Sequence, residues 1–335
     1  MTAHRPTRPP FYLTAVCGLT LVLWLLPIAL LRLPAWERWD QTHFTPLLDS
    51  SYTASGIDAD IVVFGDSSAL YGFDPQAMAA TLGLRVLNLP GSIGSLQINR
   101  DRGLQTYLAH NKPPTLIVFY LAPWDLDYGH ISPSSELYEA EEILLRHGSV
   151  LEILRFAAAH PRDALLLPLR FYHVHHPSAV LRGMRHPTPP FLAATMGHLD
   201  FNQPAIPPNC TLPAQFLSDA VTTTSVRTLL TRYNTPHTRA IVYIAPVPAC
   251  ANAASLRHPY PEISAAPPVV LPPTAFADDG HYAHLQATAV PIATQAFTDA
   301  LAAVLNSHVS TTLSGTEQPI PIPISPANSH VTITP

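Results

Sequence analysis

The stretch ADIVVFGDSS, residues 59–68, decides the fold class that we expect for this chain. Ile61 to Phe64 is a short run of β-branched and aromatic side chains, and it stops at Gly65. An apolar run that ends at a turn residue predicts a buried strand. The polar residues Asp66-Ser67-Ser68 then follow the carboxyl end of that strand, which is where open α/β sheets form their sites.

Strand-like and helix-like segments alternate after this stretch. Helices are expected over 75–82 and 96–110, and strands over 84–89 and 115–121. A fourth strand is expected over 239–245, where RAIVYIA forms another apolar run. This alternation predicts an α/β domain with a parallel central sheet that helices cover on both faces.

The alternation breaks after Asp125. Residues 129–238 have a helical and irregular pattern, and we interpret them as an insertion into a domain of residues 58–305. A closing helix is expected over 285–304. The segment 306–335 is rich in Ser, Thr and Pro, which predicts a disordered tail.

An apolar segment precedes the domain. Residues 11–31 carry no charge, and at a rise of about 1.5 Å per residue such a helix spans a hydrocarbon core of about 30 Å. The segment is longer than the apolar part of a signal peptide, and no small-x-small cleavage site follows it. We therefore expect an uncleaved anchor at 11–33, with a cytoplasmic segment 1–10 before it and a linker 34–57 after it.

The charges that flank this segment bear on topology. Arg5 and Arg8 precede it, and on the other side Glu37 and Asp40 partly offset Arg32 and Arg38. The positive-inside rule then favours a cytoplasmic N-terminus. The expected protein crosses the inner membrane once and has its domain in the periplasm.

Composition excludes several classes. Of the 335 residues 47% are hydrophobic and 12% charged, against a usual charged share of about 25%. The 18 basic residues form no patch suited to a phosphate backbone, so nucleic acid is not expected as a partner. Cys210 and Cys250 lie in the soluble part, and the sequence leaves open one disulfide or two separate buried thiols.

Three segments of the expected sheet end in reactive side chains. Ser67 follows the first strand, Asp125 follows the third, and Asp278-Asp279-Gly280-His281 precedes the closing helix. A serine hydroxyl becomes a nucleophile when a histidine takes its proton and a carboxylate orients that histidine. The N–H groups at the start of a helix behind Ser67 would face a developing oxyanion. The serine, the carboxylates and the histidine at these positions together predict nucleophilic acyl transfer.

At these residues the sequence resembles the SGNH/GDSL hydrolase family. GDSS with Gly72 looks like the first motif block, NLPGSIGS (88–95) is similar to the second, and DDGH (278–281) looks like the last. The resemblance covers about residues 58–128 and 239–305. It implies a three-layer, flavodoxin-like α/β fold with a parallel central sheet.

The resemblance also implies roles for individual residues. Ser67 would be the nucleophile, His281 the general base, and Asp278 the carboxylate that orients the base. The backbone N–H groups of Ser67 and Gly91 would hold the oxyanion.

Alternates exist for these roles, and one block departs from the family. His284 is the alternate base, Asp279 the alternate carboxylate, and Gly94 the alternate oxyanion glycine. The third block is usually GxND, but here Ala122 replaces the glycine and Trp124 stands where the Asn would donate to the oxyanion. Loss of such a donor typically costs about 10²–10³ in rate.

The function that the resemblance implies is hydrolysis or transfer of O-acyl groups, acetyl above all, on an envelope or exported polysaccharide. Relatives occur beside bacterial cellulose and alginate synthesis machinery, so a polysaccharide synthase or acyltransferase complex is an expected partner. No cofactor is needed, and the histidines at 173, 175 and 176 lack the neighbouring Cys or carboxylate spacing of a metal site. The alternative is a non-catalytic SGNH-like protein that binds glycan or scaffolds a synthase, which the missing Asn favours.

Overall fold

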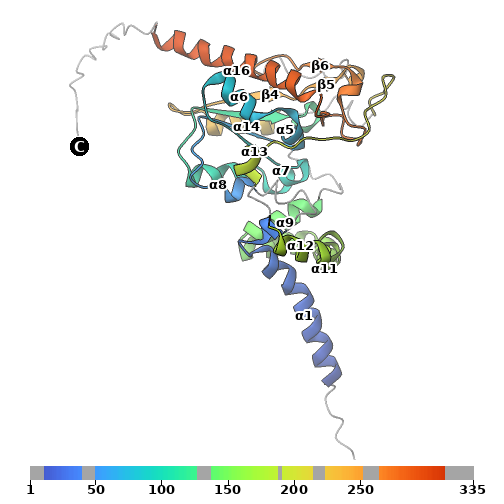
Figure 1. Ribbon diagram of the computed structural model, residues 1–335. Helices are drawn as coiled ribbons and strands as arrows, with labels where there is room; N and C mark the ends of the chain where they lie inside the picture. The colour runs from blue at the N-terminus through green and yellow to red at the C-terminus, as the bar shows by residue number, and fades with distance from the viewer. Residues whose placement is uncertain are drawn as a thin grey trace, which may run out of the picture.

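The computed structural model describes residues 11–39, 50–126, 137–187, 191–213, 223–251 and 264–313. The predicted cytoplasmic segment 1–10 and the part of the predicted tail beyond residue 313 lie outside these ranges. Figure 1 shows a body of sheet and helices, a group of helices beneath it, and one long helix that projects away from both.

A four-stranded parallel sheet forms the centre of the body. Its strands are β1 (Ile61–Gly65), β2 (Val86–Pro90), β3 (Leu116–Leu121) and β4 (Arg239–Ile244), in the order β2-β1-β3-β4. Every residue of β1, β2 and β3 is buried, as expected for strands covered on both faces. The predicted α/β class with a parallel sheet is confirmed.

One face of the sheet is covered by α6 (Pro75–Leu82) and α16 (Val290–Leu313). Met78 of α6 and Phe297 of α16 are fully buried in one cluster with Val63 of β1. Pro75 stands in the first turn of α6, where the missing N–H costs nothing, and the side chain of Asp74 caps the helix.

The opposite face is covered by α4 (Ser50–Thr53), α8 (Arg102–His110) and α14 (Thr224–Tyr233). Tyr107 of α8 and Leu229 of α14 pack in one cluster with the side chains that β1, β2 and β3 direct to this face. α14 lies within the range expected to be an insertion, yet it packs against β4 and helps to cover the sheet.

A helix break separates α8 from α7 (Ile93–Asn99), where the sequence predicted one helix over 96–110. Arg100 at the break has φ 51°, which ends α7. Asp101 is buried, and its carboxylate accepts a hydrogen bond of 2.7 Å from the hydroxyl of Tyr233. The break therefore allows a contact between residues far apart in sequence. Helical periodicity carries no information about such a contact.

A helical layer lies beneath the sheet body in Figure 1. It consists of α9 (Leu137–His147), α10 (Val150–Ala159), α11 (Pro161–Val174) and α12 (Pro177–Arg185). The short helix α2 (Trp36–Trp39) joins it: Trp36 is 2% exposed, and its ring stacks on Phe171 with centroids 5.6 Å apart. Arg32 donates to the carbonyl oxygens of Leu145 (2.9 Å) and Gly148 (2.7 Å).

The long helix α1 (Phe11–Leu31) leaves the helical layer and projects from the molecule (Figure 1). Of its side chains only Pro27 and Leu31 are buried. Its 21 residues are long and apolar enough to cross a membrane, as an anchor or a signal sequence would.

A disulfide joins Cys210 and Cys250, whose Cα atoms lie 5.9 Å apart. Cys250 belongs to the 3₁₀ turn η3 (Ala249–Ala251), which follows the short strand β5 (Val247–Pro248). β5 pairs with β6 (Val270–Leu271) in a separate two-stranded parallel sheet. Of the two possibilities that the sequence left open, the structure has the disulfide.

Candidate active site

The candidate site lies where β1 and β3 end side by side, the point at which the strand order reverses direction. β1 ends at Gly65, and helix α5 (Ser67–Gly72) begins two residues later. A Cβ atom at Gly65 would lie 1.9 Å from the carbonyl oxygen of Tyr120, and one at Gly72 would lie 2.5 Å from the Tyr120 hydroxyl. Both motif glycines are therefore required by the close approach of β3.

Asp66 fixes the turn between β1 and α5. Its side chain is 1% exposed and accepts hydrogen bonds from the amide of Ser68 (2.8 Å) and from the Ser68 hydroxyl. Its other oxygen accepts from the amide of Ala122 at 2.9 Å, directly after β3. This carboxylate joins the ends of two strands, and both of its oxygens are occupied.

Ser67 is the first residue of α5 and contacts a histidine. Its Oγ lies 2.7 Å from Nε2 of His284, and Nδ1 of the same ring lies 2.5 Å from Oδ2 of Asp279. Burial raises the pKa of Asp279, but the hydrogen bond and the charge of His284 outweigh it and lower the pKa overall. An ionised carboxylate, an imidazole and a hydroxyl thus stand in line, as serine-based acyl transfer requires.

This line corrects the expected pair of His281 and Asp278. The side chains of both are exposed. Asp278 N–H donates to the Pro204 carbonyl (2.7 Å), His281 N–H donates to Oδ1 of Asp279 (3.0 Å), and the His281 ring packs beside that of His284, with centroids 4.8 Å apart. The backbone at Gly280 (φ 82°) and Tyr282 (φ 58°) is left-handed. That turn brings the alternate carboxylate Asp279 and the alternate base His284, which are five residues apart, onto one side of the loop.

Aromatic side chains enclose His284, which is 6% exposed. The ring packs edge-on against Tyr71, with centroids 4.8 Å apart, and against Phe201, with centroids 5.6 Å apart. Tyr71 belongs to α5, the helix that begins with the nucleophile, whereas Phe201 follows the helical layer in the sequence. No motif surrounds Phe201, so sequence patterns alone do not predict its position beside the histidine.

The segment around Phe201 also braces the histidine loop. The carbonyl of Phe201 accepts a bond of 3.1 Å from the amide of Ala287, and the Gln286 side chain donates to the Gln203 carbonyl at 2.6 Å. Asn88 of β2 ties α5 to the segment that precedes Phe201, since its side-chain amide donates to the carbonyls of Ala69 (2.7 Å) and Gly197 (2.8 Å).

The expected oxyanion donor at Gly91 is engaged elsewhere. Its amide N–H donates to the carbonyl of Gly65 at 2.7 Å, which extends the β1–β2 pairing by one bond. The amide of Ser67, at the first position of α5, has no acceptor within the helix. This corrects the expectation for Gly91 and leaves Ser67 as the backbone donor beside the nucleophile.

Two further candidates for the oxyanion site lie close in sequence to these strand ends. Gly94, the alternate, lies in the first turn of α7. Trp124, which stands where the third block of SGNH hydrolases has Asn, lies in the 3₁₀ turn η1 (Pro123–Asp125) after β3. It packs with Tyr282 against a small cluster that includes Val247.

The described residues hold no group of three or more His, Cys, Asp or Glu side chains that could bind a metal ion. His175, from the histidine-rich stretch, is buried and lies 3.2 Å from the Glu142 carboxylate. That pair belongs to the helical layer.

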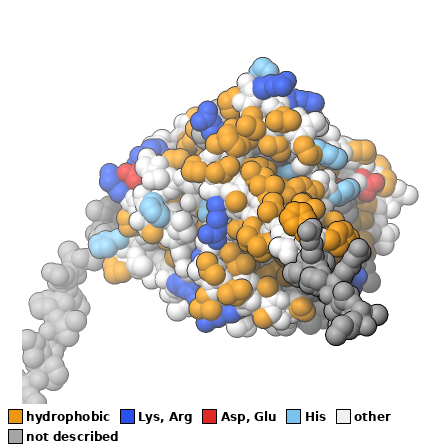
Figure 2. Space-filling model, turned by 90° about the horizontal axis from the view of Figure 1, so that it is seen from below, with side chains coloured by type: hydrophobic (Ala, Val, Ile, Leu, Met, Phe, Trp, Pro, Cys, Tyr) orange, Lys and Arg blue, Asp and Glu red, His pale blue; other side chains and the backbone are white. Residues whose placement is uncertain are grey.

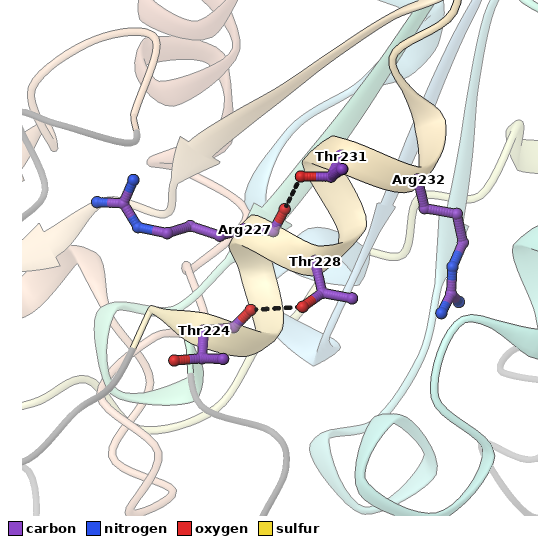
Figure 3. Close-up of a pocket in the computed structure, with 5 residues that line it drawn as sticks. All are labelled: Thr224, Arg227, Thr228, Thr231 and Arg232. Carbon is purple, nitrogen blue, oxygen red and sulfur yellow. Dashed lines mark hydrogen bonds between the residues drawn. The ribbon is translucent and has the colours of Figure 1, made fainter. Parts of the chain in front are cut away.

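A separate hollow of about 460 Å³ lies along α14 (Figure 3). Its lining residues are Thr224, Arg227, Thr228, Thr231 and Arg232. The hydroxyls of Thr228 and Thr231 donate back to their own helix, and the Arg232 guanidinium pairs with Asp101. Most of its polar groups are already bonded within the protein, so the hollow presents little to a ligand.

No protein-family model matches the chain, and no curated protein or solved structure matches it. The functional interpretation therefore rests on the motifs and on the geometry above.

Proposed function

We propose that this protein is a serine-dependent enzyme of the SGNH type that hydrolyses or transfers O-acyl groups, acetyl above all, on an envelope or exported polysaccharide. One observation carries the proposal: Ser67 Oγ, the His284 ring and the Asp279 carboxylate form a continuous chain of contacts of 2.7 and 2.5 Å. The strand order β2-β1-β3-β4 agrees with the flavodoxin-like order.

In the proposed reaction, Oγ of Ser67 attacks the ester carbonyl while Nε2 of His284 takes the hydroxyl proton. Asp279 accepts from Nδ1 and stabilises the imidazolium. The tetrahedral oxyanion faces the amide of Ser67. Collapse breaks the bond to the sugar oxygen, which takes the proton from His284 as it leaves.

The resulting acyl-serine is then attacked by an acceptor hydroxyl, whose proton passes to His284. Water as acceptor gives hydrolysis, and a second sugar hydroxyl gives transfer. Either acceptor restores Ser67 and neutral His284, so the cycle closes without a cofactor.

We further propose that α1 is a retained anchor in the inner membrane and that the domain faces the periplasm. The residues that follow α1 belong to the folded body, since Arg32 bonds two carbonyls of the helical layer and Trp36 is 2% exposed within it. Cleavage beyond Trp36 would remove these contacts. The disulfide fits an oxidising compartment.

The test is release of acyl groups by the full-length protein in nanodiscs. Acetylated cellulose and acetylated alginate serve as substrates, and free acetate and acetyl-sugar products are measured. We expect acetate release or acetyl transfer that Ser67→Ala abolishes. The matched control is Ser178→Ala on α12, an exposed serine, which should leave the rate unchanged.

A second candidate, a non-catalytic scaffold or glycan-binding subunit of a synthase complex, is favoured by the oxyanion site. Gly91 is engaged with Gly65, and Trp124 replaces the Asn donor. Under this alternative the wild type binds the polysaccharide and releases no acetate. Ser67→Ala would then bind it as well as the wild type does.

A further inference from the structure

The helical layer exposes apolar side chains on α10, α11 and α12. The most exposed are Val150 (67%), Leu151 (55%), Leu154 (60%), Leu165 (67%), Leu169 (68%), Leu181 (54%) and Met184 (48%). Single exposed leucines are ordinary on a protein surface, but seven on three consecutive helices are not. This set, the apolar face, requires an explanation beyond the core.

The spacing of these side chains shows that each helix presents a stripe. Leu165 and Leu169 are four residues apart on α11, so they lie on one side of it. Phe171 of the same helix points the other way and packs on Trp36. α11 is therefore apolar on the side that packs inward and on the side that faces out.

Positive charge accompanies the apolar face. Residues 150–185 contain five arginines and two acidic residues. Both acidic side chains are paired within the protein, Glu152 with Arg102 and Asp163 with Arg170.

The unpaired charge is basic. Four exposed arginines make no ion pair among the described residues: Arg155, Arg162, Arg182 and Arg185. Figure 2 shows the underside of the molecule, the side from which α1 projects, with hydrophobic side chains over much of it, Lys and Arg among and around them, and few acidic groups. Apolar and basic side chains together are the pattern of helices that lie on anionic lipid.

The position of the apolar face agrees with this pattern. α1 enters the helical layer directly, packing against α9 and α11, and its last residue, Leu31, is 1% exposed. The layer lies where α1 meets the body in Figure 1. A bilayer that α1 crosses would have its surface at this level.

We infer that the apolar face of α10–α12 lies in the headgroup region of the bilayer that α1 crosses, with its leucines at the acyl boundary and its arginines on anionic phospholipid headgroups. This rests on the anchor that we propose above. The helical layer would then be a second membrane attachment and would hold the candidate active site at a fixed height above the lipid.

The experiment uses the full chain in nanodiscs of phosphatidylglycerol and phosphatidylcholine. Spin labels are placed at Leu154→Cys, Leu169→Cys or Met184→Cys in a Cys17→Ser background, with Thr231→Cys on α14 as the control. Collision rates with oxygen, which enters lipid, and with a nickel chelate, which stays in water, are compared. We expect an oxygen-to-nickel ratio several-fold above that of the control at all three test positions.

Ratios equal to that of the control, in protein that co-purifies with the discs, would overturn the inference and leave the anchor intact. Failure to co-purify with the discs would instead refute the anchor. Broadening between labels on two molecules would overturn the inference in favour of a second copy on this face.

The role of charge is tested separately. Arg182→Gln together with Arg185→Gln should lower the ratio at Met184→Cys in anionic discs and leave it unchanged in phosphatidylcholine discs. An unchanged ratio in anionic discs would contradict the contact with anionic headgroups.

Discussion

The carboxyl edge of the sheet and the helical layer beneath it are built in different ways. At the edge, directed bonds fix single atoms: the Asp66 carboxylate joins two strand ends, and the His284 ring contacts Ser67 and Asp279 through its two nitrogens. In the layer, apolar packing dominates, with Trp36 stacked on Phe171. A substitution at the edge should therefore act through geometry, and one in the layer through lost buried area.

The largest expected effect is at Gly65 on the edge. Gly65→Ala would place a Cβ atom 1.9 Å from the carbonyl of Tyr120 in the neighbouring strand, so the sheet must open. We expect a loss of more than about 4 kcal/mol of unfolding free energy, in the class of severe steric changes. Urea titration measures it. The matched control is Gly91→Ala, whose Cβ would meet its nearest atom at 3.3 Å and should cost far less; equal costs would contradict the steric argument.

The helical layer should respond next most strongly, at Trp36. Trp36→Ala removes a ring that is 2% exposed and should cost about 3–5 kcal/mol. Leu169→Ala, at a position 68% exposed, should stay within about 0.5 kcal/mol in detergent. Thermal unfolding measures both, and similar costs for the two variants would show that the layer is not packed around Trp36.

The disulfide links parts of the chain 40 residues apart, and its removal should have an intermediate effect. Cys210→Ser with Cys250→Ser should cost about 2–4 kcal/mol, through greater freedom of the unfolded chain. The double variant is compared with the reduced wild type in urea. If reduction leaves the midpoint unchanged, the cross-link does not stabilise the domain.

The smallest expected effect is a pH dependence of the unfolding free energy that arises in the helical layer. Burial raises the pKa of Glu141 to about 7, although Arg170 opposes the shift. A carboxyl with a raised folded pKa gives its full stability below its unfolded pKa and loses it as the pH rises through the folded one. Stability should therefore fall between about pH 4.5 and pH 7, by up to about 3 kcal/mol.

Glu141→Gln should flatten that fall, as followed by thermal unfolding across the pH range. Glu152→Gln is the control, because the pKa of Glu152 is lowered and its side chain is exposed to solvent. A wild-type midpoint that is constant from pH 4.5 to pH 7 would contradict the assignment to Glu141.

The sheet and the nucleophile could be predicted because their signals are local. Ile61 to Phe64 is an apolar run with a turn residue after it, and Ser67 follows at once. The choice of histidine could not be predicted in this way. His281 and His284 are both near the closing helix, and the left-handed turn at Gly280 and Tyr282 decides which ring reaches the serine.

The remaining misses depend on contacts between distant residues. Helical periodicity predicts one continuous helix through Asp101. The helix breaks there because Asp101 bonds to Tyr233, which is 132 residues away in the sequence. The closing helix was expected from residue 285 but begins at Val290, because the residues before it bridge to the preceding loop and pack beside Phe201. Such partners become visible only when the chain is folded.

The contact between Ser67 and His284 is the central claim, and a serine-directed fluorophosphonate probe tests it most directly. Labelling rates of the wild type, His284→Ala and His281→Ala are compared in full-length protein, with Ser67→Ala as the blank. We expect labelling at Ser67 that falls by about 10⁴-fold or more in His284→Ala, since the hydroxyl loses its base, and that changes little in His281→Ala. The reverse order of the two histidine variants, or no labelling of folded wild type, would contradict the account.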